Sequence, residues 1–342
     1  SRMQILVTGG AGYIGTPLCL RLLELGHGVT CWDPGLFGFH FPSPLPGLDL
    51  RARRVQDMSA QDFEQIAPQW VLHLSGLSND PMANFAPQMN WEENTRASEH
   101  VGALAKKFDV PLVFASSASV YGYQPDAILT EDCDVSPIGH YSESKAAAER
   151  WLSDHVPRVF CLRQATVMGW SPRMRFDLLT NGMTLSAFSQ GRIQVLYGGR
   201  EARPQVHVLD LVEAYVRVLS TPRLATGVYN VSSSNDNVMG LAQVIQSQLK
   251  QQYGRCIELA VTDEARKHRS YNLSSQRLTD ATGWRATRSV ADTVDELCIR
   301  LSEPDFDPHD PRMLNIAWMK LLFDAQSILD RAGRIDTTDR GQ

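Results

Sequence analysis

Short apolar segments alternate with longer amphipathic stretches through the first half of the chain. Five short runs are rich in branched or aromatic residues, as buried parallel strands are. They cover residues 5–8, 29–32, 70–74, 111–115 and 159–162. Between them, apolar residues recur at helical spacing over residues 14–23, 95–108 and 144–155. This alternation predicts an α/β fold, namely a doubly wound parallel sheet of the Rossmann type with helices on both faces.

The alternation breaks down after Arg163, where Gly, Pro and Arg are scattered through residues 166–204. A strand-like run at 227–231 indicates that the chain returns to the sheet and leaves it again. We therefore expect a smaller, discontinuous second domain in the C-terminal half. The expected ranges are 1–165 plus about 205–235 for the sheet domain, about 166–204 and 236–302 for the second domain, and 303–342 for a proline-rich linker and a last helix, 313–332, docked on its own chain.

Composition narrows the class of protein further. Lys and Arg number 33 against 38 Asp and Glu, a net charge of −5, and no block of like charge stands out. This argues against a nucleic-acid or membrane-surface binder. The six cysteines lie far apart and match no metal-binding spacing, so we expect reduced thiols and no metal. With no leader peptide or membrane span visible, we expect a cytoplasmic protein.

A glycine-rich loop follows the first predicted strand and opens the first predicted helix. It reads Gly9-Gly10-Ala11-Gly12-Tyr13-Ile14-Gly15, which satisfies both G-x-G-x-x-G and G-x-x-G-x-x-G. Glycines leave backbone N–H groups unshielded at a helix N-terminus, where the diphosphate of a dinucleotide binds. The alternative is that these glycines only turn the chain.

An acidic residue supports the dinucleotide interpretation. Asp33 ends the second predicted strand, eighteen residues after Gly15, where a carboxylate accepts hydrogen bonds from adenosine ribose hydroxyls. No Lys or Arg follows within residues 34–38, so a 2′-phosphate would meet a negative charge and no cation. The pattern therefore favours NAD over NADP, although Asp33 could instead cap a loop.

Candidate catalytic groups follow later strands. Ser117 lies at the end of the fourth run, and Tyr141 and Lys145 share one face of a helix because four residues separate them. A phenol with a pKa near 10 is a poor base unless a neighbouring ammonium lowers that pKa. Tyr141 would then take a proton from a substrate hydroxyl, while Ser117 holds the same oxygen. A chance Tyr-Lys spacing and a polar strand end are the alternatives.

Together these motifs resemble the extended short-chain dehydrogenase/reductases, specifically the NAD-dependent epimerase/dehydratase family that acts on nucleotide sugars. The likeness runs to about residue 300, and the loop at 9–15 and the run at 116–122 are most similar to those of sugar 4-epimerases. The resemblance implies a catalytic triad of Ser117, Tyr141 and Lys145. It also implies a homodimer formed through the helices at 95–108 and 141–155.

The resemblance further implies two sets of binding residues. The cofactor, NAD, would be contacted by Gly9, Gly12, Tyr13, Ile14, Gly15, Asp33, Leu74, Ser75, Gly76, Tyr141 and Lys145, with Asp57 and Met58 against the adenine. A nucleoside-diphosphate sugar would be contacted by Ser117, Ser119, Tyr141, Thr166, Asn181, Arg203 and Arg269. Arginines suit a diphosphate because one guanidinium holds two phosphate oxygens.

Three departures from the family pattern bear on the reaction. Thr166 replaces the usual Asn of R-x-x-N-x-x-G, and Ser274-Ser275-Gln276-Arg277 replaces D-x-S-K. Ala118 and Ser119 stand where 4,6-dehydratases carry Asp and Glu and where decarboxylating members carry Glu. We therefore expect oxidation and reduction at a single carbon. The leading hypothesis is 4-epimerisation of a nucleotide sugar through a 4-keto intermediate. The alternatives are a one-way 4-keto-sugar reductase or dehydrogenase, and a non-catalytic dinucleotide sensor.

Overall fold

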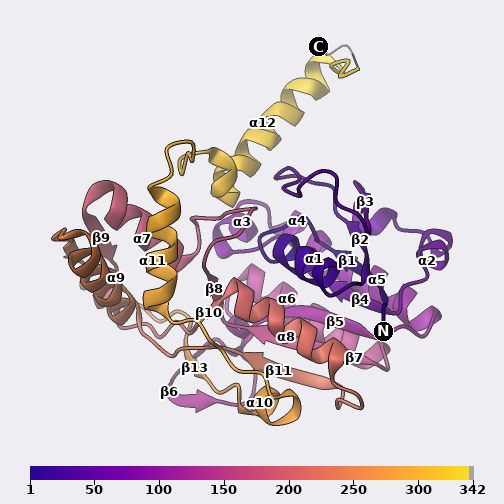
Figure 1. Ribbon diagram of the computed structural model, residues 1–342, viewed down its shortest axis with the longest axis horizontal. Coiled ribbons are helices and arrows are strands. Elements are labelled where there is room, and N and C mark those ends of the chain that lie inside the picture. Colours follow the sequence, from indigo (N-terminus) through magenta and orange to yellow (C-terminus); the bar gives the residue numbers. More distant parts are fainter. Residues whose placement is uncertain (339–342) are drawn as a thin grey trace.

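A seven-stranded parallel sheet forms the centre of the computed structural model, which describes residues 1–338 (Figure 1). Its strand order is β11-β7-β5-β4-β1-β2-β3, which confirms the doubly wound architecture. The bounds are β1 Gln4–Thr8, β2 Gly28–Trp32, β3 Leu48–Arg51, β4 Trp70–His73, β5 Leu112–Ser117, β7 Val159–Gln164 and β11 Gly227–Val231. All six predicted runs are strands of this sheet.

Alternation along β1 shows how the sheet is covered on both faces. Ile5 and Val7 point into a core shared with α1 (Gly15–Glu24) and α8 (Val208–Ser220). Leu6 points into a separate core on the opposite face. That second core is built from α2 (Ala60–Ile66), α5 (Ala97–Lys107) and α6 (His140–His155). Successive side chains of a strand face opposite ways, so a strand buried on both faces is apolar throughout.

Some elements differ from the prediction. β3 was not expected, because this edge strand is only partly buried and carries charge at Asp49 and Arg51. The helix expected at 95–108 starts earlier, since α4 (Pro87–Trp91) continues through a π-helical turn at Glu92–Arg96 into α5. By contrast, α6 begins at His140, within one residue of the start expected from the Tyr141–Lys145 spacing, so Tyr141 lies in its first turn.

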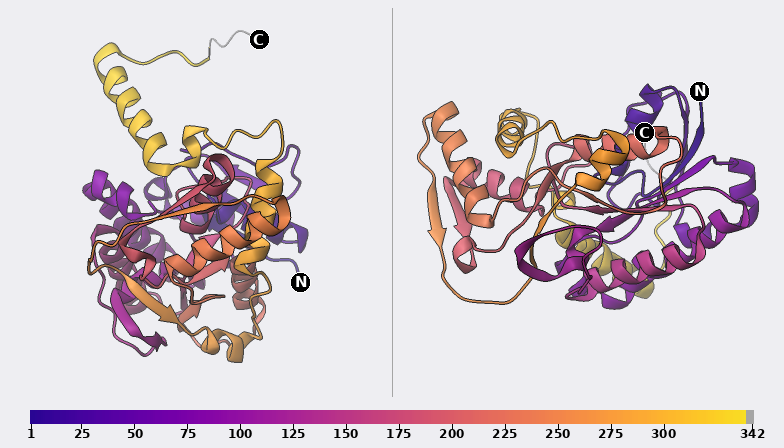
Figure 2. Two further views of the ribbon diagram at one scale, coloured as in Figure 1. Left: turned by 90° about the vertical axis from the view of Figure 1, so that its left-hand side faces the viewer. Right: turned by 90° about the horizontal axis from the view of Figure 1, so that it is seen from below.

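The second part of the molecule packs beside the carboxyl ends of the strands (Figures 1 and 2). Its apolar core is enclosed by three helices, α7 (Leu179–Gln190), α9 (Val238–Tyr253) and α11 (Val290–Leu301). Short parallel strand pairs complete it. They are β8 (Thr166–Met168) with β10 (Gln205–His207), β9 (Arg192–Val195) with β12 (Glu258–Val261), and β6 (Tyr123–Leu129) with β13 (Ser270–Leu273). The β9–β12 pair lies at its outer end, away from the sheet (Figures 1 and 2). The division of the chain into two domains at the stated residues stays a prediction.

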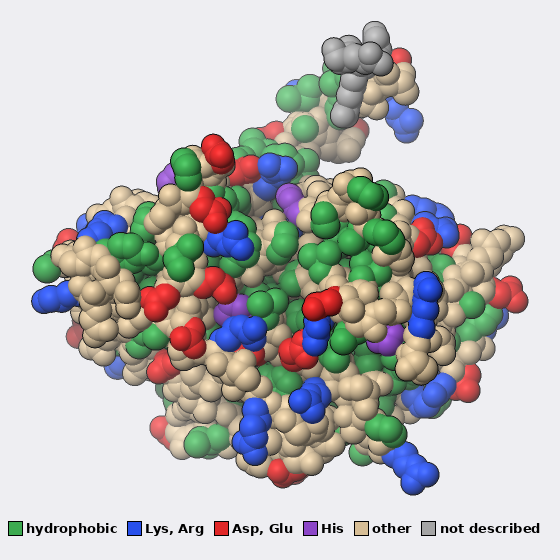
Figure 3. Space-filling model, in the orientation of Figure 1, with side chains coloured by type: hydrophobic (Ala, Val, Ile, Leu, Met, Phe, Trp, Pro, Cys, Tyr) green, Lys and Arg blue, Asp and Glu red, His purple; other side chains and the backbone are tan. Residues whose placement is uncertain are grey.

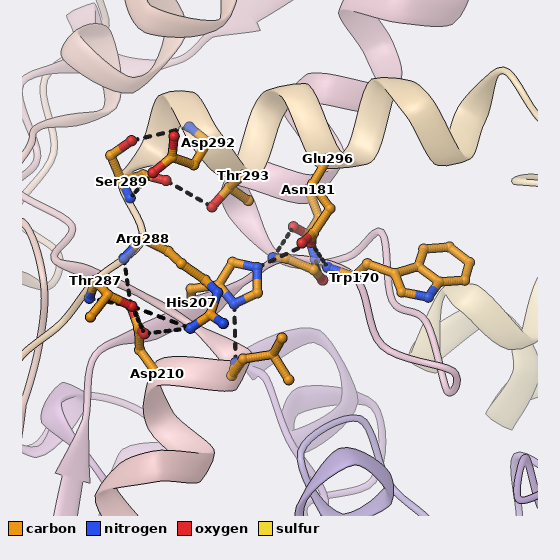
Figure 4. A network of polar contacts seen from close by, with 12 residues as sticks. Trp170, Asn181, His207, Asp210, Thr287, Arg288, Ser289, Asp292, Thr293 and Glu296 are labelled. Atoms are coloured by element: carbon orange, nitrogen blue, oxygen red, sulfur yellow. Dashed lines mark hydrogen bonds and ion pairs between the residues drawn. The ribbon is translucent and has the colours of Figure 1, made fainter. Parts of the chain in front are cut away.

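A buried polar network joins the discontinuous segments (Figure 4). Asp210, at the start of α8, accepts hydrogen bonds from Thr287 and Arg288, with a 2.7 Å ion pair to the Arg288 guanidinium. His207 contacts Glu296 of α11 at 3.0 Å. These contacts lock the segment before α11 against the end of the sheet.

The last helix, α12 (Asn315–Ala332), leaves the body of the molecule at an angle (Figure 1). Its first turns pack on the chain, because Met319 is 2% exposed and contacts a cluster that includes Leu77 and Met82. Residues 339–342 of the expected C-terminal segment lie outside the described residues. Among residues 1–338, no helix is both long and apolar enough to cross a bilayer. Acidic and basic side chains are interspersed over the face drawn in Figure 3.

Candidate active site

A cavity of about 600 Å³ opens at the carboxyl ends of the central strands. Its wall comes from the loops after β1, β2, β4, β5 and β7, from the first turns of α6, and from the start of α12. Ligands of open parallel sheets bind at this edge, where the loops diverge. The glycine loop and the predicted catalytic residues therefore share one continuous cavity.

The glycine loop packs so closely against backbone atoms that Gly9 and Gly15 have no room for a side chain. Gly9 has φ +69°, and a Cβ there would lie 2.6 Å from the Ser75 amide nitrogen. A Cβ at Gly15 would overlap the carbonyl oxygen of Gly9. No side chain caps the N-terminus of α1, and the wall of the cavity there is made by residues 11–15. Uncapped N–H groups at this position fit a diphosphate.

Asp33 lines the cavity and also braces the loops around it. Its carboxylate accepts hydrogen bonds from the amides of Ala11 at 3.1 Å and Gly35 at 2.8 Å. Burial raises the pKa of this carboxyl, and the two amides oppose the shift. Asp33 thus both caps a loop and lines the cavity. Its binding of a ribose stays a prediction.

A chain of hydroxyl groups surrounds the predicted catalytic tyrosine. The Ser117 hydroxyl lies 2.8 Å from the Ser119 hydroxyl and acts to lower the pKa of the Tyr141 phenol. Ser142, beside Tyr141 in α6, donates to Ser119 at 3.0 Å and accepts from Arg269 at 3.1 Å. These contacts hold Ser117 and Ser119 at the cavity wall that Tyr141 also lines.

Two arginines add positive charge around Tyr141. Burial raises the pKa of its phenol, while Ser117, Arg269 and Arg175 act to lower it. Lys145 donates to the Ala115 carbonyl oxygen at 3.1 Å. The effect of Lys145 on the Tyr141 phenol stays a prediction.

Burial of Lys145 predicts a measurable pH dependence of stability. Burial lowers its pKa from 10.5 to about 8, so the unfolded state binds more protons between these values and stability rises with pH there. From about pH 7 to about pH 9.5, the nucleotide-free protein should gain about 2 kcal/mol of unfolding free energy relative to Lys145→Met. Urea unfolding at both pH values measures this difference. Lys106→Met, at an exposed lysine, is the control. The difference in unfolding free energy between the protein and this variant should not change with pH over the same range.

Most of the predicted binding residues line the cavity. They are Gly9, Gly12, Tyr13, Ile14, Gly15, Asp33, Leu74, Ser75, Gly76, Ser117, Ser119, Tyr141, Lys145, Thr166, Arg203 and Arg269. Arg203 pairs with Glu201 at 2.9 Å, and Arg269 pairs with Asp80. The contacts that each residue makes with a ligand stay predictions.

Three predicted residues lie away from the cavity wall. Asn181 is fully buried, where it accepts from the Gly169 amide at 2.9 Å and donates to the Arg175 carbonyl oxygen at 3.0 Å (Figure 4). It therefore holds the loop before α7 in place. Met58 is buried in the core under α5, and Asp57 is exposed outside the cavity. These three residues are thus not among those that line the cavity, and their contacts with a ligand stay predictions.

The structure also adds residues that sequence reasoning missed. Asp80 follows β4, and Arg173, Arg175 and Asp177 follow β8, while Asn315 comes from the start of α12. Arg175 pairs with Asp177 at 2.8 Å and donates to Ser78 at 2.9 Å. The Arg-x-Arg-x-Asp spacing at 173–177 was the available signal. Within residues 1–338, no group of three or more His, Cys, Asp or Glu side chains is arranged to hold a metal ion.

Comparison with known families settles the class of protein. The sequence model of the NAD dependent epimerase/dehydratase family matches residues 5–232. The chain belongs to the NAD-dependent epimerase/dehydratase family. It is accordingly an enzyme of the extended short-chain dehydrogenase/reductase type, and NAD is its cofactor.

Relatives of this family member include enzymes with different reactions. It is 29% identical over 272 residues to UDP-glucose 4-epimerase 3 of Oryza sativa subsp. japonica, covering 67% of this chain and 72% of that protein. It is 27% identical over 267 residues to UDP-glucuronic acid decarboxylase 1 of Danio rerio, covering 72% of this chain and 60% of that protein. The solved structure of MoeE5 in complex with UDP-glucuronic acid and NAD has a TM-score of 0.75 at 24% identity, with 88% of this chain and all of that chain covered. The structural likeness confirms the fold.

Proposed function

We propose that this enzyme is an NAD-dependent 4-epimerase of a nucleoside-diphosphate sugar. The observation that carries the proposal is that Ser117, Tyr141 and Lys145, the last one helical turn after Tyr141, all line the cavity that contains the glycine loop. The 4-epimerase relative supports this choice of reaction. Arg203 and Arg269, which line the cavity from segments that follow β7 of the sheet, are the groups we assign to the substrate's diphosphate end.

The residues of this chain supply proton transfer and orientation. The Tyr141 phenolate accepts the proton of the sugar 4-hydroxyl, and the Ser117 hydroxyl donates a hydrogen bond to the same oxygen as it becomes a ketone. Bound NAD supplies the acceptor, and afterwards the donor, of the hydride at that carbon. When the keto-sugar has turned its other face, Tyr141 returns the proton to the oxygen, and the configuration at C4 is inverted.

The carboxylates that line the cavity are engaged in ion pairs or hydrogen bonds, which disfavours elimination or decarboxylation of the sugar. Next to Ser117, Ala118 is buried and the Ser119 hydroxyl is held by Ser117 and Ser142. The carboxylates that line the cavity within residues 1–338 all have partners. Asp33 accepts from backbone amides, Asp80 pairs with Arg269, Glu93 with Arg54 and Asp177 with Arg175. A carboxyl group free to act as acid or base next to the ketone is thus not found among these residues, which favours simple redox at one carbon.

Turnover without added cofactor tests the proposal. The purified enzyme is mixed with UDP-glucose, UDP-galactose and UDP-glucuronic acid in turn, and the products are separated by chromatography and identified by NMR. An epimerase converts many substrate molecules per active site without added NAD, because the hydride returns to the same sugar. One equivalent of keto-sugar with accumulation of NADH would instead indicate the one-way dehydrogenase. A 6-deoxy-4-keto sugar or a pentose product would show elimination or decarboxylation and overturn the proposal.

A further inference from the structure

The start of the C-terminal helix forms part of the cavity wall, although it lies beyond the region matched by the family model. Asn315 and Met319 line the same cavity as the glycine loop, whereas that match ends at residue 232. Trp318 anchors this segment by donating to the Leu36 carbonyl oxygen at 2.6 Å. Leu36 belongs to the loop that follows Asp33. The segment at 311–319 is therefore fastened to the loop after β2 that follows Asp33.

The segment at 311–319 also forms hydrogen bonds with a buried arginine, Arg173, which follows β8. Arg173 is 3% exposed, and its Nη atoms donate to the carbonyl oxygens of Met174 at 2.7 Å and Arg312 at 3.0 Å. It also donates to the Asn315 side-chain oxygen at 2.7 Å. Its Nε is buried without a hydrogen-bond partner. All of these acceptors are neutral, so hydrogen bonds orient the guanidinium without neutralising its charge.

Arg173 differs from the other arginines of the cavity wall in this respect. Each of the others forms an ion pair: Arg54 with Glu93, Arg175 with Asp177, Arg203 with Glu201, and Arg269 with Asp80. Within residues 1–338, no carboxylate lies within ion-pair distance of Arg173. Burial and the neighbouring guanidinium of Arg175 lower the pKa of Arg173 to about 9, while the more distant carboxylates of Asp177 and Asp33 act in the opposite direction. A buried cation that contacts no carboxylate directly is costly, and an anionic ligand reduces that cost.

The position of Arg173 indicates which anion it meets. Its guanidinium stacks on the Phe37 ring, with 3.9 Å between the guanidinium carbon and the ring centroid, and Phe37 is in the loop after Asp33. Arg173 is also close enough to Asp33 for its charge to lower the pKa of that carboxyl. Asp33 is in turn bonded to the glycine loop through Ala11. The guanidinium thus lines the same cavity as the glycine loop and is connected to that loop through Asp33.

We propose that Arg173 binds the diphosphate of NAD, and that Asn315 and the Arg312 carbonyl of the C-terminal segment position it to do so. A diphosphate offers more oxygens than the N–H groups of one helix terminus satisfy, and a planar guanidinium can bind two of them. The inference rests on NAD as the cofactor and is independent of whether the reaction is 4-epimerisation. It makes residues 311–319 a functional part of the cofactor site.

Calorimetric titration of nucleotide-free protein tests the role of Arg173. Arg173→Gln should weaken NAD binding by about 10- to 100-fold, the range for loss of a charge-assisted hydrogen bond. UDP and NADP are titrated as separate probes. Loss of UDP affinity with unchanged NAD affinity would assign Arg173 to the substrate, and loss confined to NADP would assign it to a 2′-phosphate; either result overturns the proposal. If the unsubstituted protein does not bind NAD, the assignment of NAD as cofactor is wrong, and with it the proposal for Arg173. Weakened NAD binding only in Arg173→Gln supports the proposal.

A second variant separates the charge of Arg173 from its contribution to folding. Asn315→Asp keeps the guanidinium and its contact but places a carboxylate against it, so NAD affinity should again fall about tenfold or more. In the Arg173→Gln background, the same change should have a much smaller effect, because it acts through Arg173. Trp318→Phe is the matched comparison: it removes the hydrogen bond that anchors the segment to Leu36 without changing charge. Its loss of NAD affinity measures the contribution of docking alone and should be clearly smaller than the loss in Asn315→Asp. Equal losses in the Asn315 and Trp318 variants would show that docking of the segment, and not charge, matters and would overturn the proposal.

Discussion

Replacing Tyr141 with phenylalanine should lower the turnover number by about 10²- to 10⁴-fold, the range that a positioned acid–base group contributes. The phenol is the group within reach of Ser117 that can both accept and return a proton. NAD affinity should fall by no more than about tenfold, because at most one neutral hydrogen bond is lost. Steady-state turnover and calorimetric titration with NAD measure the two quantities.

The pH dependence of turnover provides a second check on Tyr141. Burial raises the pKa of the phenol above its usual value of 10.0, so the phenolate is the minor form near neutrality. Turnover should therefore rise with pH through the neutral range, and Tyr141→Phe should lose this rise. Tyr121→Phe is the control, because Tyr121 is buried outside the cavity, where its hydroxyl donates to Asn230 at 2.7 Å. Full activity in Tyr141→Phe would contradict the mechanism. If Tyr141→Phe has no turnover but keeps the biological role of the protein, a dinucleotide sensor is favoured instead.

The parts of the site that sequence reasoning predicted are those in which local backbone geometry and chemistry coincide. The glycine loop at 9–15 needs bare backbone because the loop packs on itself and on Ser75, and that need is visible as glycine spacing. Tyr141 and Lys145 share a helix face, so their spacing alone brings them to the same edge of the sheet. The strands were predictable for the same reason, since burial on both faces makes them apolar throughout.

The parts that were missed depend on contacts between distant segments. Arg173 meets Asn315 across 142 residues of sequence, and the Arg-x-Arg-x-Asp spacing at 173–177 does not by itself say that the two residues come together at the cavity. Asn181 has the residue type expected for a phosphate contact, but the fold turns its amide toward Gly169 and Arg175. α7 escaped detection because its buried residues are largely small or polar and form no apolar stripe.

A buried ion pair behind the site should have the largest effect on stability. Arg163 of β7 and Glu149 of α6 have side chains 7% and 10% exposed, and the Glu149 carboxylate also accepts from Ser116 at 2.6 Å. Arg163 donates in addition to the Tyr121 hydroxyl at 3.0 Å. Arg163→Met should lower the free energy of unfolding by about 3–5 kcal/mol, because it leaves the Glu149 charge buried without its partner. Urea unfolding measures the change.

A double variant shows whether the cost comes from the unpaired charge. Arg163→Met combined with Glu149→Leu removes both charges, and its unfolding free energy should recover much of the loss seen in Arg163→Met. If the double variant is less stable than Arg163→Met, packing rather than charge dominates at this position. Glu149 lies one further turn along the helix face that carries Tyr141 and Lys145, so the pair fixes this face of α6 against β5 and β7. Arg163→Met should therefore also reduce turnover at temperatures where the variant is still folded, since the phenol is then held less firmly beside Ser117.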